Sequence, residues 1–343
     1  MNAQTTQMRR EIEEIPVAVE RLLSEGQGGI TAAAEAIRAA DPALLVSVAR
    51  GSSDHACTYL KYASELLLGL PMASVGPSVA SVYGAELKLA RAACISVSQS
   101  GKSPDIVEMT RSARAGGAYA VAITNDLTSP LAQTANAALG ICAGPELSVA
   151  ATKTFVTSLV SGLWLLAECK QDKALLDAIR LLPAELDAAT RCDWSAAVDA
   201  ITGSSLYTLG RGPSWAISNE AALKFKETCQ IHAESYSSAE VLHGPVSIVD
   251  QDFPVIGFAA ADAAEGALVD VAAQIAGKGA QVFVTSDKAH GGAQVLAHQR
   301  TSHWLTDPIA LIVSFYAMVE QVAAKRGINP DAPRHLKKVT ETV

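Results

Sequence analysis

Ser98-Gln99-Ser100-Gly101-Lys102-Ser103-Pro104-Asp105 is the stretch that decides the fold. It follows the apolar run Ala92–Val97, which has the length and composition of a buried strand, and it precedes a helical pattern over residues 106–115. Ser103 is a suitable N-cap and Pro104 suits the first helical position. The sequence therefore predicts a strand, a loop rich in hydroxyl groups and a helix, in that order.

This loop has the chemistry of an anion site. The first backbone N–H groups of a helix lack partners within the helix, and the helix dipole favours negative charge there. The serine hydroxyls and Lys102 add donors suited to a phosphate group. The pattern G-x-x-x-x-G-K-[ST] is absent, so a nucleoside triphosphate is not indicated. An ordinary capped turn is the alternative that the loop by itself leaves open.

Composition indicates a globular chain with a large core. The 343 residues suffice for about two domains of roughly 150 residues each, and 49% of them are hydrophobic against 18% charged. The net charge of −8 argues against a nucleic-acid partner, because nucleic-acid binders carry a basic stripe. A small anionic ligand stays compatible with this charge, since a local cradle binds phosphate even on an acidic protein.

The sequence predicts a cytoplasmic protein without a membrane span. The first 16 residues are polar and lack the apolar region of a secretory signal, and no run reaches about 18 apolar residues. No metal ion is expected, because no zinc spacing fits the cluster of His232, Glu234, Glu240 and His243. No cysteine pair has C-x-x-C spacing, so we expect six buried free thiols: Cys57, Cys94, Cys142, Cys169, Cys192 and Cys229.

The two halves of the chain repeat at a constant offset of 161 residues. Arg50-Gly51 matches Arg211-Gly212, Ala115-Gly116 matches Ala276-Gly277, and Thr124 and Asp126 match Thr285 and Asp287. In each half, short apolar runs alternate with longer helical segments, which predicts parallel strands joined by right-handed crossovers. The predicted fold class is therefore α/β, with two tandem domains that are each a parallel sheet flanked by helices.

The predicted organisation has five parts. An amphipathic helix over residues 6–25 opens the chain, with apolar side chains at Ile12, Ile15, Val19, Leu22 and Leu23. The connector between the domains is charged, helical and interrupted by Pro183. The parts are an N-terminal helical segment (1–29), a first domain (30–170), the connector (171–199), a second domain (200–330) and a tail (331–343) that contributes to the active site.

The repeat also separates the two halves by function. At the offset that relates them, Ser98-Gln99-Ser100-Gly101 corresponds to Ala259-Ala260-Ala261-Asp262. The second half has lost the hydroxyl groups and gained an acid. We therefore expect only the first half to bind the anion, at the carboxyl ends of its strands, where open parallel sheets bind ligands.

Several ordered motifs resemble the sugar isomerase (SIS) domain family. Together they cover about residues 30–340 and are similar to the isomerase half of glucosamine-6-phosphate synthase. No glutaminase half is seen, so the chain is more similar to stand-alone SIS-type glucosamine-6-phosphate deaminases. The motifs are residues 50–53, 98–103, 146–154, 209–212, 220–227, 232–236, 240–245 and 333–338.

The resemblance implies roles for individual residues. Glu227 is the base at C1 and C2, with Lys224 and Glu220 beside it, His243 opens the ring, and Lys338 brings an amine near C2. A homodimer is also implied, in which the His243 loop completes the active site of the neighbouring subunit. The phosphate group is held by Ser98, Gln99, Ser100 and Ser103, and the sugar chain is contacted by Ser52, Ser53, Val149 and Ala151.

This chain departs from the family synthase at two places. Ala151 stands where the synthase carries serine, and Lys102-Ser103 stands where it carries glutamate and threonine. These differences bear on the sugar contacts more than on the phosphate site.

The residues themselves give partial support to these roles. Glu220, Lys224 and Glu227 are spaced i, i+4 and i+7, so they share one face of a helix. A solvated face with ordinary ion pairs is the alternative, but the apolar neighbours of these residues favour a partly buried face. His243 precedes Gly244-Pro245 in a turn, where a histidine can relay protons or simply be exposed.

The expected function is conversion of glucosamine 6-phosphate to fructose 6-phosphate and ammonia, without metal or redox cofactor. The partner is a small sugar phosphate, and the apolar pattern of residues 149–167, taken as a helix, adds to the expectation of a homodimer. Two alternatives stay open: a fructosamine-6-phosphate deglycase and a non-catalytic sugar-phosphate-binding regulator. By sequence alone, solvated charge is the preferred explanation of Lys338, which stands next to Lys337.

Overall fold

The computed structural model describes residues 5–338 of the chain. These residues form two compact units, which we name after the sheet that each contains. The first-sheet unit comprises residues 17–146, 153–180 and 337–338. The second-sheet unit comprises residues 5–16, 147–152 and 181–336. Residues 339–343 of the predicted tail lie outside the described part.

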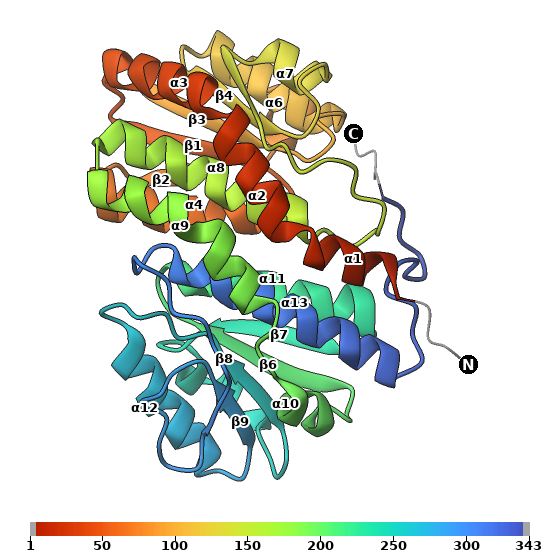
Figure 1. Ribbon diagram of the computed structural model, residues 1–343. Helices are drawn as coiled ribbons and strands as arrows, with labels where there is room; N and C mark the ends of the chain where they lie inside the picture. Colours follow the sequence, from red (N-terminus) through yellow and green to blue (C-terminus); the bar gives the residue numbers. More distant parts are fainter. Residues whose placement is uncertain (1–4, 339–343) are drawn as a thin grey trace. The chain divides into compact units, whose positions relative to one another are not determined.

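The first-sheet unit contains a parallel sheet of five strands in the order β2-β1-β3-β4-β5 (Figure 1). Strand β3 has the bounds that the sequence predicts. Strands β1 and β4 end within one residue of the apolar runs 44–49 and 119–123 of the sequence. The strands are β1 (Leu44–Val48), β2 (Met72–Ser74), β3 (Ala92–Val97), β4 (Tyr119–Thr124) and β5 (Ala137–Gly140).

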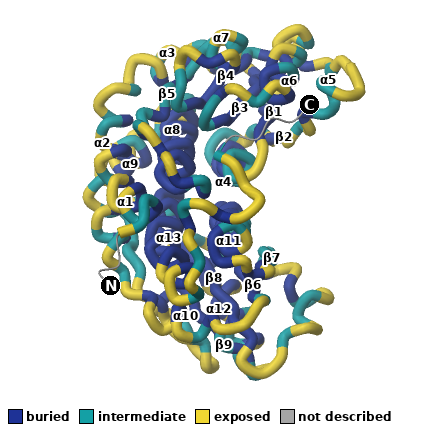
Figure 2. The backbone as a smooth tube through the Cα atoms, turned by 90° about the vertical axis from the view of Figure 1, so that its right-hand side faces the viewer, coloured by how far each residue is buried: buried dark blue, intermediate teal, exposed yellow. Residues whose placement is uncertain are grey.

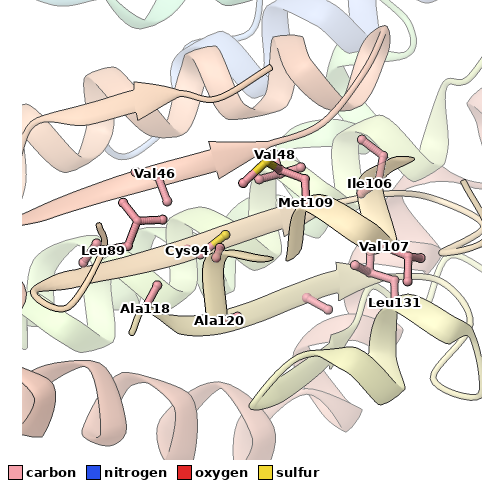
Figure 3. Close-up of a cluster of buried hydrophobic side chains, with 13 residues drawn as sticks. Val46, Val48, Leu89, Cys94, Ile106, Val107, Met109, Ala118, Ala120 and Leu131 are labelled. Carbon is pink, nitrogen blue, oxygen red and sulfur yellow. The ribbon is translucent and has the colours of Figure 1, made fainter. Parts of the chain in front are cut away.

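Helices cover both faces of this sheet. Helix α8 (Lys153–Lys170) packs with α3 (Gln27–Ala40) and α4 (Ser52–Leu68), while α6 (Pro104–Ala115) packs with α5 (Ser78–Ser81) and α7 (Pro130–Thr134). Alternate strand residues point to opposite faces, so each strand supplies both cores. Figure 3 shows the core under α6, where Val46, Val48 and Cys94 from the strands meet Ile106 and Met109 of the helix.

The second-sheet unit repeats this arrangement with the order β10-β9-β8-β6-β7. Helix α11 (Pro213–Cys229) packs on α13 (Asp307–Lys325), which also contacts α1 (Gln7–Glu13) and α10 (Ser195–Ala200), and α12 (Glu265–Ala276) packs on β8 and β9. The strands are β6 (Ser205–Gly210), β7 (His232–Ser237), β8 (Pro254–Gly257), β9 (Gln281–Val284) and β10 (Gln294–Val295); two short 3-10 helices, η1 (Val241–His243) and η2 (Pro245–Ile248), follow β7.

Backbone geometry confirms the predicted duplication. Helices α4 and α11 begin 161 residues apart, at Ser52 and Pro213, and so do α6 and α12. The residue before α4 is Gly51 with φ 55° and ψ −132°, and the residue before α11 is Gly212 with φ 58° and ψ −136°. Only glycine adopts this conformation without strain, which explains why both halves retain it. The fold class is therefore the predicted one, two parallel α/β sandwiches.

The N-terminal segment differs from the single helix predicted over residues 6–25. It forms α1 and α2 (Ile15–Glu25), with a break at Glu14. Pro16 explains the break, because proline lacks an N–H and its ring clashes with the carbonyl one turn earlier. The predicted apolar stripe is nevertheless buried, fully at Ile12, Ile15, Val19 and Leu22 and partly at Leu23.

The connector contains the predicted helix, α9 (Lys173–Ala189), with Pro183 in its interior. The prediction that all six cysteines are buried is wrong for three of them. Cys57, Cys94 and Cys229 are buried, and Cys142, Cys169 and Cys192 are half-buried because they lie near the ends of loops and helices.

Two apolar helices bear on the sequence expectations. The helix expected from Val149 begins only at Lys153 and is buried on all sides as far as Ala167, as the dark α8 in Figure 2 shows. Its apolar surface is covered within this chain, so it no longer argues for a second copy. Helix α13 is long and apolar enough to cross a membrane by length and composition, but 89% of its most apolar window is buried, as in the core helix of a soluble protein.

Candidate functional site

The carboxyl edge of the first sheet brings two groups of predicted site residues together. Strands β1 and β3 are parallel neighbours, and the chain leaves them in opposite directions, to β2 and to β4. Ligands bind at such a switch point in open parallel sheets. Ser52 and Ser53 open α4 after β1, and residues 98–103 form the loop between β3 and α6.

Gly101 sets the shape of this loop. Its φ is 62°, and a Cβ atom there would lie 2.1 Å from the Ser129 hydroxyl oxygen. Its N–H donates to the Ser98 hydroxyl at 3.2 Å, and the Lys102 N–H donates to the Ser100 hydroxyl at 3.3 Å. The hydroxyls are therefore held by the loop's own backbone.

The first residues of α6 distinguish this loop from an ordinary capped turn. Ser103 occupies the N-cap position and Pro104 follows it, as predicted, but the Ser103 side chain makes no capping hydrogen bond. Gln99 and Ser100 are half-buried, like Ser103. The geometry therefore favours use of these side chains for something other than capping the helix.

Sequence reasoning missed an ion pair at this helix start. Asp105 is fully buried, and its carboxylate accepts from Nε of Arg50 at 2.5 Å and from the Ile106 N–H at 2.9 Å. The Arg50 side chain is 49% exposed, so its guanidinium compensates Asp105 and adds positive charge to the sheet edge. The repeated Arg-Gly dipeptide was the available signal for this residue.

Lys102 is exposed and lies near an acid. Its side chain is 61% exposed, and its Nζ lies 3.8 Å from Oδ2 of Asp126. Two hydrogen bonds from Thr128, followed by the Lys102 charge, hold the pKa of Asp126 below its usual value. That Lys102 adds a donor to the loop stays a prediction.

In the second-sheet unit, the equivalent edge is filled by the chain itself. The guanidinium of Arg300 donates to Asp307 at 2.8 Å and to Glu265 at 2.7 Å. The same group donates to the backbone carbonyls of Ala259 and Thr285. An internal cation, paired with two acids of the chain itself, thus occupies the edge beside Ala259, which favours the expectation that only the first half binds an anion.

Helix α11 brings Glu220, Lys224 and Glu227 together, as their spacing predicts. Lys224 Nζ lies 3.2 Å from Oε1 of Glu220 and 2.5 Å from Oε2 of Glu227. The side chains of Glu220 and Lys224 are 0% and 1% exposed, and that of Glu227 is 22% exposed. A solvated face is therefore the wrong description of this helix.

The pKa of Lys224 reflects the opposing effects of burial and of the neighbouring charges. Burial alone would lower the pKa of its ammonium group, but the two carboxylates outweigh burial and raise it above the usual value. The hydroxyl of Tyr316 on α13 donates to Glu220 at 3.2 Å, a partner that the sequence did not indicate. Glu220 and Lys224 are thus fixed inside the unit, and Glu227 is the member that reaches its surface.

A pocket of about 510 Å³ lies beside Glu227 in the same unit. It mixes one carboxylate with cationic side chains from α11 and from the C-terminal segment, a combination that suits a small polar ligand. Its lining is Leu223, Lys226, Glu227, Gln230, Ile231, His232, Arg334, His335 and Leu336.

Lys338 belongs to the first-sheet unit and is paired there. Its Nζ lies 2.8 Å from Oε2 of Glu146, whose side chain is fully buried. The predicted description of Lys338 as a solvated charge is wrong, because its side chain is 25% exposed and bonded to a buried acid. Glu146 was part of the family motif but had no predicted role.

Val149 and Ala151 lie in a non-helical segment of the second-sheet unit, before α8. Buried Glu11 of α1 accepts the N–H groups of Leu147 and Ser148, and the N–H of Val149 donates to the carbonyl of Asp331. The Asp331 carboxylate in turn accepts the N–H groups of Gln7 and Met8. These anchors were missed because they join segments far apart in the chain.

His243 ends η1, is exposed, and is not among the described residues that line the Glu227 pocket. Its predicted role depends on a second subunit and stays a prediction. Among residues 5–338, no group of three His, Cys, Asp or Glu side chains has the arrangement of a metal site.

Comparison with known proteins places the chain in a family. Residues 41–168 and 202–325 both match the sequence model of the SIS domain. The chain belongs to the SIS domain family. The two SIS segments contain the first and the second sheet, respectively, and the resemblance that the motifs indicated is thereby confirmed.

Curated relatives of this SIS protein are named glutamine–fructose-6-phosphate aminotransferase (isomerizing). That of Sulfolobus acidocaldarius is 31% identical over an alignment of 309 positions, which covers 86% of this chain and 49% of the relative. That of Aeropyrum pernix is 33% identical over an alignment of 352 positions, which covers 96% of this chain and 56% of the relative. The SIS protein therefore spans about half the length of the curated relatives it matches.

Solved structures resemble it over nearly the whole chain. A Silicibacter pomeroyi protein, provisionally named a phosphosugar isomerase, is 63% identical with a TM-score of 0.92, covering 95% of this chain and all of that one. Glucosamine-6-phosphate deaminase of Thermotoga maritima has a TM-score of 0.79 over 98% of this chain and all of that one, at 17% identity. At that identity the likeness concerns the fold alone.

Proposed function

We propose that this SIS protein converts glucosamine 6-phosphate and water to fructose 6-phosphate and ammonia. The observation that carries the proposal is the buried cluster of α11, in which Lys224 joins Glu220 to a Glu227 that lines a pocket. Aldose–ketose chemistry needs a carboxylate that moves a proton between adjacent carbons, held in place and partly shielded from water. The names of the curated relatives, isomerizing aminotransferases of fructose 6-phosphate, add support for a sugar-phosphate substrate and for amino-group chemistry.

The proposed reaction starts from the open-chain aldehyde. Glu227 takes the proton from C2, and the aldehyde oxygen takes up a proton, which gives an enolamine with a double bond between C1 and C2. Return of a proton to C1 gives the imine at C2. Water adds to C2, the C–N bond breaks, and ammonia leaves fructose 6-phosphate.

The other predicted residues have supporting roles in this proposal. The hydroxyl loop of residues 98–103 holds the phosphate group, with Arg50 adding positive charge beside it. Val149 and Ala151 contact the sugar chain together with Ser52 and Ser53. His243 opens the ring, and Lys338 places its amine near C2.

A plain phosphosugar isomerase is the second candidate, because the 63% identical structure carries that provisional name. The same proton transfer serves both reactions, and they differ in whether nitrogen is lost. A panel of glucosamine 6-phosphate, fructosamine 6-phosphates and the 6-phosphates of unaminated hexoses separates them, with ammonia and ketose formation both measured.

Ammonia release from glucosamine 6-phosphate supports the proposal. Ketose formation without nitrogen loss favours the isomerase, and release of an amine from fructosamine 6-phosphates favours a deglycase. Tight binding of sugar phosphates without turnover of any of them would instead indicate a regulator.

A further inference from the structure

Glu146 is a deeply buried acid that the proposed mechanism does not use. Its side chain is 0% exposed and lies just before the segment of residues 147–152. Oε1 accepts the N–H of Thr154 at 3.1 Å, and Oε2 accepts the Thr154 hydroxyl at 2.7 Å. Thr154 is the second residue of α8, so the carboxylate also sits at the positive end of that helix.

Lys338 supplies the opposite charge to this acid. Its Nζ donates to Oε2 of Glu146 at 2.8 Å, across 192 residues of sequence. A fully buried carboxylate is costly unless it is paired and hydrogen-bonded, and breaking such a pair costs several kcal/mol. Burial alone would raise the pKa of Glu146, but Lys338 and then Thr154 outweigh burial and hold the pKa below its usual value.

Burial and hydrogen bonding indicate which of the two residues holds the other in place. Glu146 is fixed at the start of α8 by its two hydrogen bonds with Thr154, whereas Lys338 comes from a segment without helix or strand. The fixed group therefore determines where the other lies. A lysine on a flexible stem needs such an anchor to hold its amine at one place.

We propose that Glu146 is a positioning residue, which holds the Lys338 amine in its working place in the reaction. This inference rests on the proposed function only for the role of Lys338 near C2. Misplacement of a reacting group by about 1 Å costs on the order of 100-fold in rate, so loss of the anchor is expected to lower kcat more than to raise KM.

A double-mutant cycle in kcat tests this. Glu146→Gln keeps the shape and an acceptor for Thr154 but removes the charge, and it is expected to lower kcat by about 10- to 100-fold. In a Lys338→Met background the same change is expected to alter kcat by less than about twofold, because Glu146 acts through Lys338. Glu35→Gln, an exposed loss of a carboxylate charge on α3 of the same unit, is the matched control and should leave kcat nearly unchanged.

An equal loss in both backgrounds, or no loss in the wild-type background, overturns the proposal. A second measurement does not depend on any activity. Trypsin cleavage after Arg334 and Lys337 is expected to be faster in Glu146→Gln than in the wild type, and unchanged in Glu35→Gln. If the wild type turns over no sugar phosphate, the proposed function fails, but the cleavage rates still test whether Glu146 holds Lys338 in place. Equal cleavage rates in Glu146→Gln and the wild type would show that it does not.

Discussion

Lys224 shows how a single buried charge depends on its neighbours. Its ammonium group is 1% exposed and stays charged only because Glu220 and Glu227 lie within hydrogen-bond distance. Removing one member of a buried pair leaves the other without compensation, whereas replacing both by apolar groups of similar size is often neutral. Stability and chemistry are therefore coupled at this residue.

Lys224→Met is expected to lower the free energy of unfolding by about 3–5 kcal/mol, because Glu220 would remain buried and unpaired. The double variant Glu220→Leu with Lys224→Met is expected to lose less than Lys224→Met alone. Urea unfolding followed by circular dichroism measures both. Simple additivity of the two single changes would contradict the buried-pair explanation.

Glu227 is the member of the cluster that can reach a ligand, with 22% of its side chain exposed. Glu227→Gln keeps the shape and removes the base, so kcat is expected to fall at least about 100-fold with little change in KM. Glu13→Gln, an exposed change on α1, is the matched control.

Heavy water sharpens this test. The wild type is expected to place deuterium at C1 of the fructose 6-phosphate formed or at C2 of recovered glucosamine 6-phosphate, unless the transferred proton is shielded from solvent. Near-normal ammonia release by Glu227→Gln would remove Glu227 from the mechanism and leave His243 as the next candidate base.

Titration of Glu146 is expected to make the free energy of unfolding depend on pH. Because the pKa of this carboxyl is lower in the folded chain than its ordinary value of 4.5, the unfolded chain binds the proton first. The stability that Glu146 contributes is therefore present above about pH 4.5 and lost as the pH falls through the folded-state value. Wild type should exceed Glu146→Gln in unfolding free energy at pH 7, and the difference should shrink in acid; a constant difference would contradict this.

At the scale of elements, local patterns predicted the strands well and the helix ends less well. β3 has the predicted bounds because it is a short apolar run between clear breaks. The break at Glu14 escaped the periodicity, since the apolar stripe continues across it. The late start of α8 depends on Glu11, which binds the preceding segment from the other end of the chain and leaves no local signal.

Gly101 controls the conformation of the hydroxyl loop as an element. Gly101→Ala places a methyl group against Ser129 at a positive φ, so it is expected to cost about 1–3 kcal/mol of stability and to raise KM for the sugar phosphate. Gly28→Ala in α3 is the control, because no atom lies within 4 Å of its Cβ position.

The control variant is expected to gain up to about 1 kcal/mol from helix propensity without any effect on KM. Thermal unfolding and initial rates measure both variants. An unchanged KM in Gly101→Ala would separate the loop from substrate binding.

At the scale of the whole chain, duplication was the most informative property of the sequence. Matching residues at a fixed offset predicted two equivalent sheets, and the loss of serines predicted that they differ in function. The sequence could not show that Arg300 fills the second edge, because that residue lies 35 positions from Glu265, the acid it pairs with. It also could not assign Arg50, Tyr316 or Glu146, whose roles arise from contacts between distant segments.

A homodimer with shared active sites is the prediction that reaches furthest beyond one chain. His243 is exposed at the end of η1, and its proposed partner site belongs to a second copy. If each site takes Glu227 from one subunit and His243 from the other, a mixed dimer of Glu227→Gln and His243→Ala chains contains one intact site and one doubly altered site. Unfolding and refolding an equal mixture is then expected to restore about a quarter of wild-type activity, since half of the dimers are mixed and half of their sites are intact.

Sedimentation of the wild type at assay concentration is measured alongside, with each variant refolded alone as the control. Activity that stays at the level of the separate variants, or an active monomer, would show that both residues act within one chain or that His243 takes no part. Recovery of activity requires His243 to act in the site of the other subunit, because sites built within one chain would each carry one altered residue, which exchange of chains does not repair.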